Sequence, residues 1–282
     1  MQNSKMVDVS VIIVSYNTKD LTLQCIKSII DSIERLDYEI IVIDNGSSDG
    51  SLDSIQSLKF KFQNDKSKLK VIKNDENLGF SKANNQGIKV AKGRYILLLN
   101  SDTKAKKGAI EKLINFAKNT PDAGVIGPKL LNPDGSTQTS VFRLPTVNRA
   151  IQQYWFGKKE ILDKYVPTGS EPVSVESLVM AAFLITPHAV KKVGLLDERY
   201  FMFYEDHDYC RRVTNVGLKV YYLPSSEVLH YHGASGKNLA NYENQWRRLI
   251  PSSKIYHGFL GHHLLTLIIW SGQKFRNILP LK

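Results

Sequence analysis

The feature of this sequence that most constrains its fold is the alternation of apolar, β-branched runs with helix-periodic segments over the first hundred residues. The run VDVSVIIVSYN (7–17) has few polar breaks, as expected of a strand buried on both faces of a parallel sheet. In KDLTLQCIKSIIDSI, which follows, one helical stripe is formed by Leu21, Cys25, Ile29 and Ile33. YEIIVIDNGSSDGS then gives a second apolar run that ends in a polar, glycine-rich turn. The order predicts a strand, helix, strand unit.

The same alternation continues through LKVIKN (69–74), a helical SKANNQGIKVAKG (81–93) and the strong strand RYILLLNSDT (94–103). We therefore predict an α/β fold with a doubly wound sheet, in which ligands bind beyond the carboxyl ends of the strands. The polar residues expected to gather at that edge are Tyr16, Asp44, Asn45, Ser101 and Asp102. Residues 1–103 are predicted to form a nucleotide-binding half.

Residues 104–236 alternate less regularly. The apolar VESLVMAAFLI (175–185), a helix from Asp206 to Asn215 and the strand LKVYYLP (218–224) still imply a core shared with the first half. We expect this segment to be the second half of the same domain.

Charge and cysteine content narrow the classes of partner. The net charge of +11 suggests an anionic partner, which could be nucleic acid, phospholipid or a phosphate-bearing small molecule. From Lys237 to the end there are seven Lys or Arg against the single acid Glu243, so the C-terminus is the expected contact surface. The two cysteines follow no metal or redox spacing, and nothing near Met1 reads as a secretion signal, so a reducing cytoplasm is expected.

Residues 237–282 are predicted to form a basic, amphipathic helical tail. Its apolar face would contain Tyr256, Phe259, Leu260, Leu264, Leu267, Ile268, Phe275 and Ile278. A bilayer span needs about 20 mostly apolar residues, and histidines and glycines interrupt this run. One interpretation is an interfacial helix held to anionic lipid, and the other is a helix packed on the domain or on a second subunit. Nucleic acid is not expected, because the basic residues accompany an apolar helical face and not a base-stacking surface.

Familiar nucleotide motifs are absent from the chain. No G-x-G-x-x-G follows the first strand, and GASGKN (233–238) lacks the earlier glycine and the Ser or Thr of a P-loop. Carboxylates at strand ends remain. Asp44 could accept the imide hydrogen of uracil or thymine, and Asp102 could hold a divalent metal against a diphosphate. Either residue could instead be a turn-forming aspartate that bonds its own backbone.

The stretch FMFYEDHDYC (201–210) sets Glu205, Asp206 and Asp208 around a histidine. Asp206 alone could be a helix cap, but three acids within four residues repel one another. A metal, a basic neighbour or a raised pKa is needed to hold them together. In LHYHG, His230 lies two residues from His232, and a histidine near a carboxylate and a diphosphate is a plausible metal ligand.

Five blocks of the sequence, taken together, resemble the family 2 inverting glycosyltransferases of the GT-A fold. They are VSVIIVSYN, VIDNGSSDGS, NLGFSKANNQGIKVAKGRYILLLNSDT, LLDERYFMFYEDHDYCRRVTNVG and VLHYHG. The blocks span residues 9–233 in the order of the family, and the likeness is closest to the bacterial rhamnosyltransferase-like branch that builds cell-surface polysaccharide. The resemblance implies a mixed sheet with a nucleotide-binding and an acceptor-binding half, followed by C-terminal helices.

The resemblance also implies roles for individual residues. Tyr16 and Asp44 would contact the nucleotide base, and Gly79 would pass close to the nucleotide. Ser101 and Asp102 stand where the family has its Asp-x-Asp-like motif, so Asp102 would be the main carboxylate for Mn²⁺ or Mg²⁺. His230 matches a histidine that ligates metal or diphosphate in some relatives. The catalytic set implied by the match is Asp206 as general base, Glu205 as its support and Asp208 as an acid that binds the acceptor.

The implied reaction is a single inverting displacement on a nucleotide sugar. The best match is L-rhamnose from dTDP-rhamnose, moved onto a lipid-linked or polysaccharide acceptor on the cytoplasmic face of the plasma membrane. The Gln-x-x-Arg-Trp motif of processive relatives is absent, since NQWRR (244–248) has the wrong order, so a non-processive enzyme is expected. The alternatives are a sugar nucleotidyltransferase and a transferase of the same family that uses UDP-hexose or UDP-galactofuranose.

Overall fold

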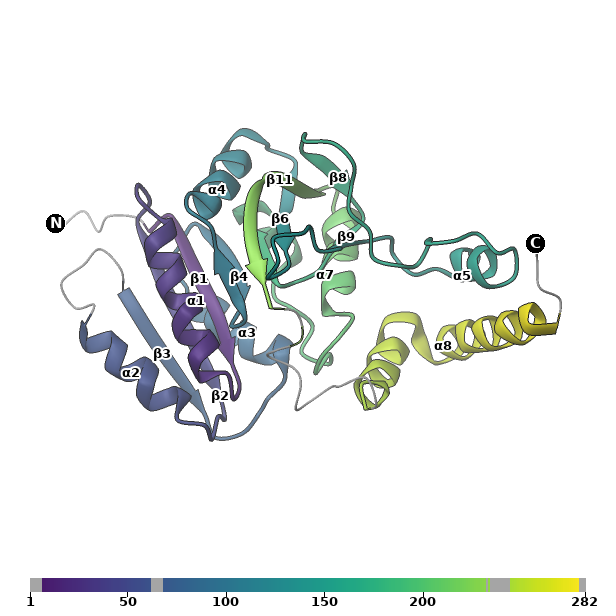
Figure 1. Ribbon diagram of the computed structural model, residues 1–282, viewed down its shortest axis with the longest axis horizontal. Coiled ribbons are helices and arrows are strands. Elements are labelled where there is room, and N and C mark those ends of the chain that lie inside the picture. The colour runs from purple at the N-terminus through teal and green to yellow at the C-terminus, as the bar shows by residue number, and fades with distance from the viewer. Residues whose placement is uncertain (1–6, 62–67, 232, 234–243, 279–282) are drawn as a thin grey trace.

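The computed structural model describes residues 7–61, 68–231, 233 and 244–278, and these residues fold around a mixed nine-stranded sheet (Figure 1). The strand order is β3-β2-β1-β4-β10-β6-β11-β5, with β8 paired to β11 beside this path. The strands of this sheet are β1 (Val9–Ser15), β2 (Tyr38–Asn45), β3 (Lys68–Asn74), β4 (Tyr95–Asn100), β5 (Thr103–Ala105), β6 (Ala123–Leu131), β8 (Val173–Val175), β10 (Ala182–Ile185) and β11 (Lys219–His230). A small second sheet pairs β7 (Val141–Phe142) with β9 (Ser177–Leu178).

Strands β3, β2, β1 and β4 run parallel, so the carboxyl ends of these four strands meet at one edge. Strand β10 runs antiparallel to both β4 and β6, which makes the whole sheet mixed. The predicted doubly wound α/β sheet is therefore confirmed. Strands from both sides of residue 103 contribute to this sheet, and the boundary between the two predicted halves stays a prediction.

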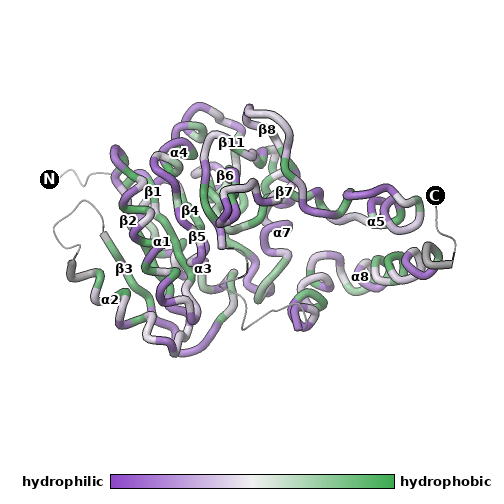
Figure 2. The backbone as a smooth tube through the Cα atoms, viewed as in Figure 1, coloured by the Kyte–Doolittle hydropathy of each residue, from purple (hydrophilic) through white to green (hydrophobic). Residues whose placement is uncertain are grey.

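Helices cover both faces of the sheet. One face packs on α1, α2 and α4, through residues such as Ile26, Ile55 and Leu113. The other packs on α3, α6 and α7, through Ala83, Ala189 and Val213. Figure 2 shows hydrophobic residues along the central strands, between these two layers. The helices are α1 (Lys19–Ser32), α2 (Ser51–Lys61), α3 (Phe80–Val90), α4 (Ala109–Asn119), α5 (Val147–Tyr154), α6 (Pro187–Val193), α7 (Glu205–Asn215) and α8 (Trp246–Ile278).

Helix α8 lies beside α5, away from the sheet (Figure 1), and it bends at Gly258, whose φ of 73° is not helical. After the bend, Leu265 and Ile268 are buried against α5 together with Ala150. Tyr256 and Ile268 are therefore buried, whereas Phe259 and Leu260 of the same predicted apolar face are exposed. The residues of that face do not share one environment. The packing on the domain that was one of the two interpretations is therefore present, along one side of the helix.

Apolar side chains of α8 that do not pack in this cluster remain open to solvent. The large ones are Trp246, Ile250, Phe259, Leu260, Leu264, Leu267, Trp270 and Phe275. Within the parts of the chain that the structure describes, no helix combines the length and the hydropathy that crossing a bilayer would require. Residues 237–243 and 279–282 and the side chain of Ile278 lie outside the described residues, as does His232.

Candidate functional site

Loops that follow β1 and β2 are fastened to each other at the carboxyl edge of the sheet. The Asn17 amide donates to Ser47 Oγ at 3.0 Å, and the Ser48 amide donates to Asn17 Oδ1 at 2.8 Å. Tyr16, half-buried, directly follows β1 at this junction. Because of these bonds, the loop that carries Tyr16 is held against the loop that follows Asp44.

The carboxylate of Asp44 is buried at the end of β2, where only 1% of the residue is exposed. Its Oδ2 accepts a hydrogen bond from the Ser47 amide at 3.3 Å, as the turn interpretation predicted. Its Oδ1 has no hydrogen-bond partner among the described residues, although it is inaccessible. A buried acceptor without a donor is costly to keep, so this oxygen suits a ligand that brings an N–H group. A uracil or thymine imide has that group.

A set of asparagines shapes the loop that leads to Gly79. Asn45 Oδ1 accepts from the Leu78 amide at 3.1 Å, and Asn45 Nδ2 donates to Asn77 Oδ1 at 2.9 Å. Gly79 has a φ of +86°, and a Cβ there would lie 2.8 Å from the carbonyl oxygen of Phe201. The structure thus requires glycine because the segment before the acidic cluster packs on it, a reason that the sequence did not show. The Phe80 amide donates to the Phe201 carbonyl at 2.7 Å.

Asp102 and His230 meet where the turn after β4 lies beside the end of β11. Both are buried, and His230 Nε2 lies 3.5 Å from Asp102 Oδ1. Ser101, also buried, accepts a hydrogen bond from Thr18 Oγ1 at 3.0 Å, so its side chain joins this turn to the loop after β1.

Gln138 fixes the orientation of the His230 ring, and sequence reasoning missed it. Its Oε1 lies 2.7 Å from His230 Nδ1, while its Nε2 donates to the carbonyl of His230 at 3.3 Å and to Asn132 Oδ1 at 2.8 Å. The carbonyl can only accept, so the amide nitrogen faces it and Oε1 faces the ring. Nδ1 must then carry the proton, which leaves Nε2 as the nitrogen directed at Asp102.

This arrangement fits a divalent cation. A buried carboxylate oxygen and an imidazole Nε2 that lie 3.5 Å apart are two ligand atoms that could share one ion. Nowhere in the described residues do three or more His, Cys, Asp or Glu side chains form a metal cluster, so further ligands would have to come from a diphosphate and water.

The chain turns sharply just before the acidic cluster. Phe203 and Tyr204 are bulky residues with φ values of 72° and 67°, a left-handed conformation that stores strain. Packing holds them there: the Tyr204 ring lies 5.2 Å from the ring of Tyr256 on α8, and Ser252 donates to the Met202 carbonyl at 2.8 Å. The first part of α8 therefore supports the segment that positions the acids.

Helix α7 begins at Glu205, one residue earlier than predicted, and its cap position is Tyr204, so Asp206 is not the cap. The Asp206 side chain is 16% exposed, and its Oδ1 accepts from the His207 amide at 2.8 Å. Glu205 is partly buried, and its Oε2 is inaccessible and has no hydrogen-bond partner among the described residues. Burial, with repulsion from Asp206, raises the pKa of Glu205 to about 8. At neutral pH, Glu205 is therefore largely uncharged, and Asp206 is the accessible carboxylate.

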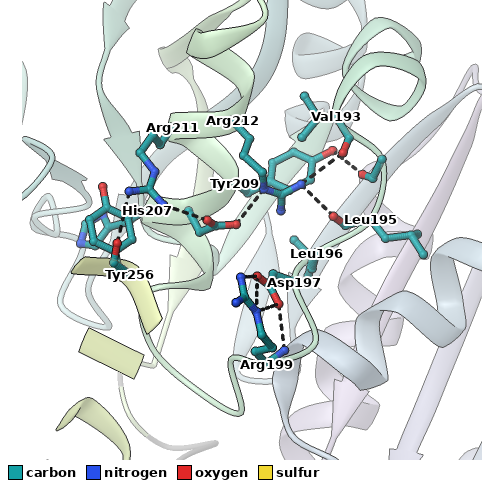
Figure 3. Close-up of polar contacts among 12 residues, drawn as sticks. Val193, Leu195, Leu196, Asp197, Arg199, His207, Tyr209, Arg211, Arg212 and Tyr256 are labelled. Carbon is teal, nitrogen blue, oxygen red and sulfur yellow. Dashed lines mark hydrogen bonds and ion pairs between the residues drawn. The ribbon is translucent and has the colours of Figure 1, made fainter. Parts of the chain in front are cut away.

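Asp208, in the same helix, is only 5% exposed. It accepts from Arg211 Nη2 at 3.3 Å and from Arg212 Nε at 2.7 Å. Figure 3 shows the two arginines reaching in different directions from α7, Arg212 to the carbonyls of Val193 and Leu195 and Arg211 to Tyr256. The contact between Asp208 and an acceptor stays a prediction, and in the structure the two arginines engage the carboxylate. These bonds fasten the helix that carries Asp206.

Comparison with known proteins gives consistent matches. The sequence model of the family described as Glycosyl transferase family 2 matches residues 10–173. The N-acetylglucosaminyl-diphospho-decaprenol L-rhamnosyltransferase of Mycobacterium tuberculosis is 29% identical over 213 residues, which cover 70% of this chain and 67% of that protein. The dTDP-rhamnosyl transferase RfbF of Shigella flexneri is 23% identical over 226 residues, which cover 79% of this chain and 68% of that protein.

Solved structures show the same fold at lower identity. GalNAc-T7, crystallised with UDP, GalNAc and Mn²⁺, superposes with a TM-score of 0.64 at 17% identity. That match covers 99% of this chain but only 56% of the GalNAc-T7 chain. The mannosyltransferase PcManGT from Pyrobaculum calidifontis, with GDP-Man and Mn²⁺, gives a TM-score of 0.61 at 13% identity and covers 98% of this chain and 76% of its own.

Proposed function

Because the chain belongs to glycosyl transferase family 2, we propose that it moves one sugar from a nucleotide donor to a hydroxyl of a lipid-linked or polysaccharide acceptor. The predicted family, its rhamnosyltransferase-like branch and the GT-A fold are confirmed by the matches. L-Rhamnose from dTDP-rhamnose is the leading donor, since two relatives are named for rhamnosyl transfer. A UDP-sugar is second, because GalNAc-T7 holds UDP.

The observation that carries this proposal is that the site has two parts. One is the edge of the sheet that would bind the nucleotide donor, which we call the donor edge, and the other is the base Asp206, which would face the acceptor. Asp44 and the pair of Asp102 and His230 lie at ends of sheet strands, where a nucleotide diphosphate would bind. The contact between Phe201 and Gly79 joins the acidic segment to this edge. In the proposed complex, the acceptor hydroxyl lies between the carboxylate of Asp206 and the anomeric carbon of the donor.

Asp206 takes the proton of the acceptor hydroxyl as the hydroxyl oxygen bonds to the anomeric carbon. The bond between that carbon and the diphosphate oxygen breaks, and a nucleoside diphosphate leaves. Attack from the face opposite the leaving group inverts the anomeric configuration. General-base assistance of this kind is typically worth about 10²- to 10⁴-fold in rate. Glu205 is largely protonated at neutral pH, so it adds no second negative charge next to Asp206.

Asp102 and His230 are the proposed ligands of Mn²⁺ or Mg²⁺. A cation bound there would neutralise charge that develops on the departing diphosphate. The protein's own contribution is to hold the carboxylate buried and to present Nε2 of the imidazole through Gln138.

Replacing Gln138 by leucine should weaken Mn²⁺ binding about 10- to 100-fold, as is typical when a residue that orients a metal ligand is lost. Gln138→Glu keeps an oxygen acceptor for Nδ1 and should retain most of the affinity. Calorimetric titration of Mn²⁺ in the presence of dTDP or UDP measures this directly. Gln152→Leu, which removes an amide bond to Asn148 within α5, is the control and should leave Mn²⁺ affinity unchanged. Equal affinity in Gln138→Leu and the wild type would show that the amide does not orient the histidine.

The exposed apolar side of α8 is proposed to lie on a membrane surface that carries anionic lipid. Leu260 is 82% exposed and Phe259 is 66% exposed, which is a large cost for a helix that faces only water. Lys254, Lys274 and Arg247 come from the same helix and lie against its aromatic rings. Apolar insertion with flanking cations is the pattern of a peripheral, interfacial helix.

Leu260→Asp should lower co-sedimentation with vesicles of phosphatidylglycerol and phosphatidylcholine by roughly 10-fold or more, since burying one leucine contributes about 1.5–3 kcal/mol. The control is Val173→Asp, an exposed apolar residue on β8, which should sediment as the wild type does. Unchanged sedimentation of Leu260→Asp would rule out this face as the docking surface. A shift from dimer to monomer, with no vesicle binding by any form, would favour a second subunit in its place.

The donor is found by titrating the protein with dTDP-rhamnose, UDP-hexoses and UDP-galactofuranose, each with and without Mn²⁺, and by following the melting temperature. The proposal expects stabilisation by a dTDP- or UDP-sugar that grows when Mn²⁺ is present. No stabilisation by any nucleotide sugar would overturn the proposed function.

A further inference from the structure

The part of α8 before its bend, residues 246–257, packs on the segment that leads into the acidic cluster. Ser252 and Tyr256 are its buried residues, with 2% and 7% of their surfaces exposed. The Ser252 hydroxyl donates to the Met202 carbonyl at 2.8 Å, across 50 positions of sequence. This part of the helix is therefore fixed to the catalytic segment by tertiary contacts and is not a free tail.

The ring of Tyr256 contacts residues on both sides of the two adjacent acids. It lies 5.2 Å from the ring of Tyr204, which occupies the cap position of α7, just before Glu205. It also lies 6.2 Å from the ring of His207, whose amide donates to Asp206 Oδ1 at 2.8 Å. Both centre-to-centre distances are within the range of aromatic pairs. One ring of α8 thus borders the short stretch that carries the base.

Arg211 fastens Tyr256 to α7 in two ways, as Figure 3 shows in part. Its guanidinium lies 4.0 Å from the centre of the Tyr256 ring, and its Nη1 donates to the Tyr256 carbonyl at 3.3 Å. Its Nη2 reaches Asp208 on its own helix, also at 3.3 Å. The ring and the backbone of Tyr256 are therefore both held against the helix that begins at the acids.

The conformation just before α7 needs such support. Phe203 and Tyr204 are both left-handed, and bulky residues stay in that region only where their surroundings hold them. If Tyr204 relaxed, the start of α7 would turn and the carboxylate of Asp206 would move with it. A displacement of about 1 Å at a reacting group can cost 10²-fold in rate. The contacts of Tyr256 are thus placed where they control the position of the base.

The contacts of α8 change at its bend. Gly258, two residues after Tyr256, has a φ of 73°, and the helix takes a new direction there. Beyond the bend, Leu265 and Ile268 pack on α5 and not on the catalytic segment. Each part of α8 therefore has its own contacts, and they can be altered separately.

We propose that Tyr256 is a positioning residue for the transfer reaction, whose ring keeps Tyr204 in its left-handed conformation and so holds Asp206 at the acceptor hydroxyl. The part of α8 before Gly258 then belongs to the catalytic apparatus. The inference rests on the proposed function, because it takes Asp206 as the base. Loss of the ring slows the reaction of bound substrates and leaves donor binding intact, since the donor edge is formed by other residues.

Tyr256→Leu removes the ring and keeps an apolar side chain. It should lower kcat about 10- to 100-fold, as expected for a small displacement of a catalytic group, while donor KM and donor affinity stay within about two-fold of the wild type. Tyr256→Phe keeps the ring and should retain wild-type kcat. The rates are measured without vesicles, with the donor identified by thermal stabilisation, Mn²⁺ and an alkyl diphosphate-linked N-acetylglucosamine, and calorimetry gives the donor affinity.

Leu265→Ala is the matched control, because it removes a buried side chain of the same helix beyond the bend. It should lower the melting temperature and leave kcat unchanged. If Tyr256→Leu does not fold, Ser252→Ala tests the same packing more gently, since it removes one hydrogen bond to the Met202 carbonyl. That variant should lower kcat about 2- to 10-fold with donor affinity unchanged.

Wild-type kcat in both Tyr256→Leu and Ser252→Ala would overturn the inference. An equal loss of kcat in Tyr256→Phe would also overturn it, because the ring would then not be the group that acts. An equal loss in Leu265→Ala, or a parallel loss of donor affinity, would indicate general loosening of the fold and would reject the role as well. Failure of the proposed function would look different, since the wild type itself would then transfer no sugar from any donor.

Discussion

Asp206→Asn is expected to lower kcat for sugar transfer by about 10²- to 10⁴-fold, because the amide cannot accept the acceptor proton. The substitution keeps the shape of the side chain and the bond from the His207 amide to its Oδ1. Donor affinity should stay within about two-fold of the wild type, since the donor edge is formed by other residues. Initial rates at saturating donor, together with calorimetric donor titration, measure both quantities.

Glu205→Gln is the matched control for this experiment. Because the pKa of Glu205 is raised to about 8, the residue is mainly protonated at pH 7, and glutamine resembles that neutral form. The variant should therefore keep most of the wild-type kcat at pH 7. If Glu205→Gln lost transfer while Asp206→Asn retained it, the two roles would have to be exchanged.

Asp102→Asn is expected to cost about 10²- to 10⁴-fold in kcat, because metal stabilisation of a leaving diphosphate is worth several kcal/mol. The amide is a poor ligand, and it also removes the negative charge that faces His230. Mn²⁺ titration followed by calorimetry should show lost affinity in this variant, and so should titration of His230→Ala. Chelation of the wild type should give a similar loss of rate that added Mn²⁺ reverses.

Asp134→Asn serves as the control for Asp102→Asn, since Asp134 is an exposed turn residue bonded to Ser136. It should retain wild-type activity and metal affinity. Full transfer by Asp102→Asn, or by the wild type after chelation, would contradict a metal-assisted departure of the diphosphate.

The gathering of Asp44 and Asp102 at one edge of the sheet was predictable from the sequence because it follows from strand periodicity. Buried apolar runs that end in Asp44 and at Asp102 must bring these residues to one side of a parallel sheet. The resemblance then assigned nucleotide and metal chemistry to that edge.

Other parts of the site depend on contacts between distant segments, which no local pattern specifies. Gln138 meets His230 across 92 positions of sequence, and an isolated glutamine gives no local signal. Asp208 matched a family position, yet the following Arg211 and Arg212 engage its carboxylate. The amphipathic pattern of α8 was visible, but which side packs on α5 is decided by tertiary fit.

The central claim is tested most directly by analysing the product of the wild-type reaction. The full chain is incubated with dTDP-rhamnose, Mn²⁺ and an alkyl diphosphate-linked N-acetylglucosamine acceptor, which resembles the acceptor for which the mycobacterial relative is named, and the product is examined by mass spectrometry and NMR. The account predicts one added sugar, release of the nucleoside diphosphate and an anomeric configuration opposite to that of the donor. Retained configuration, or no transfer from dTDP-rhamnose or from any UDP-sugar tested in its place, would contradict it.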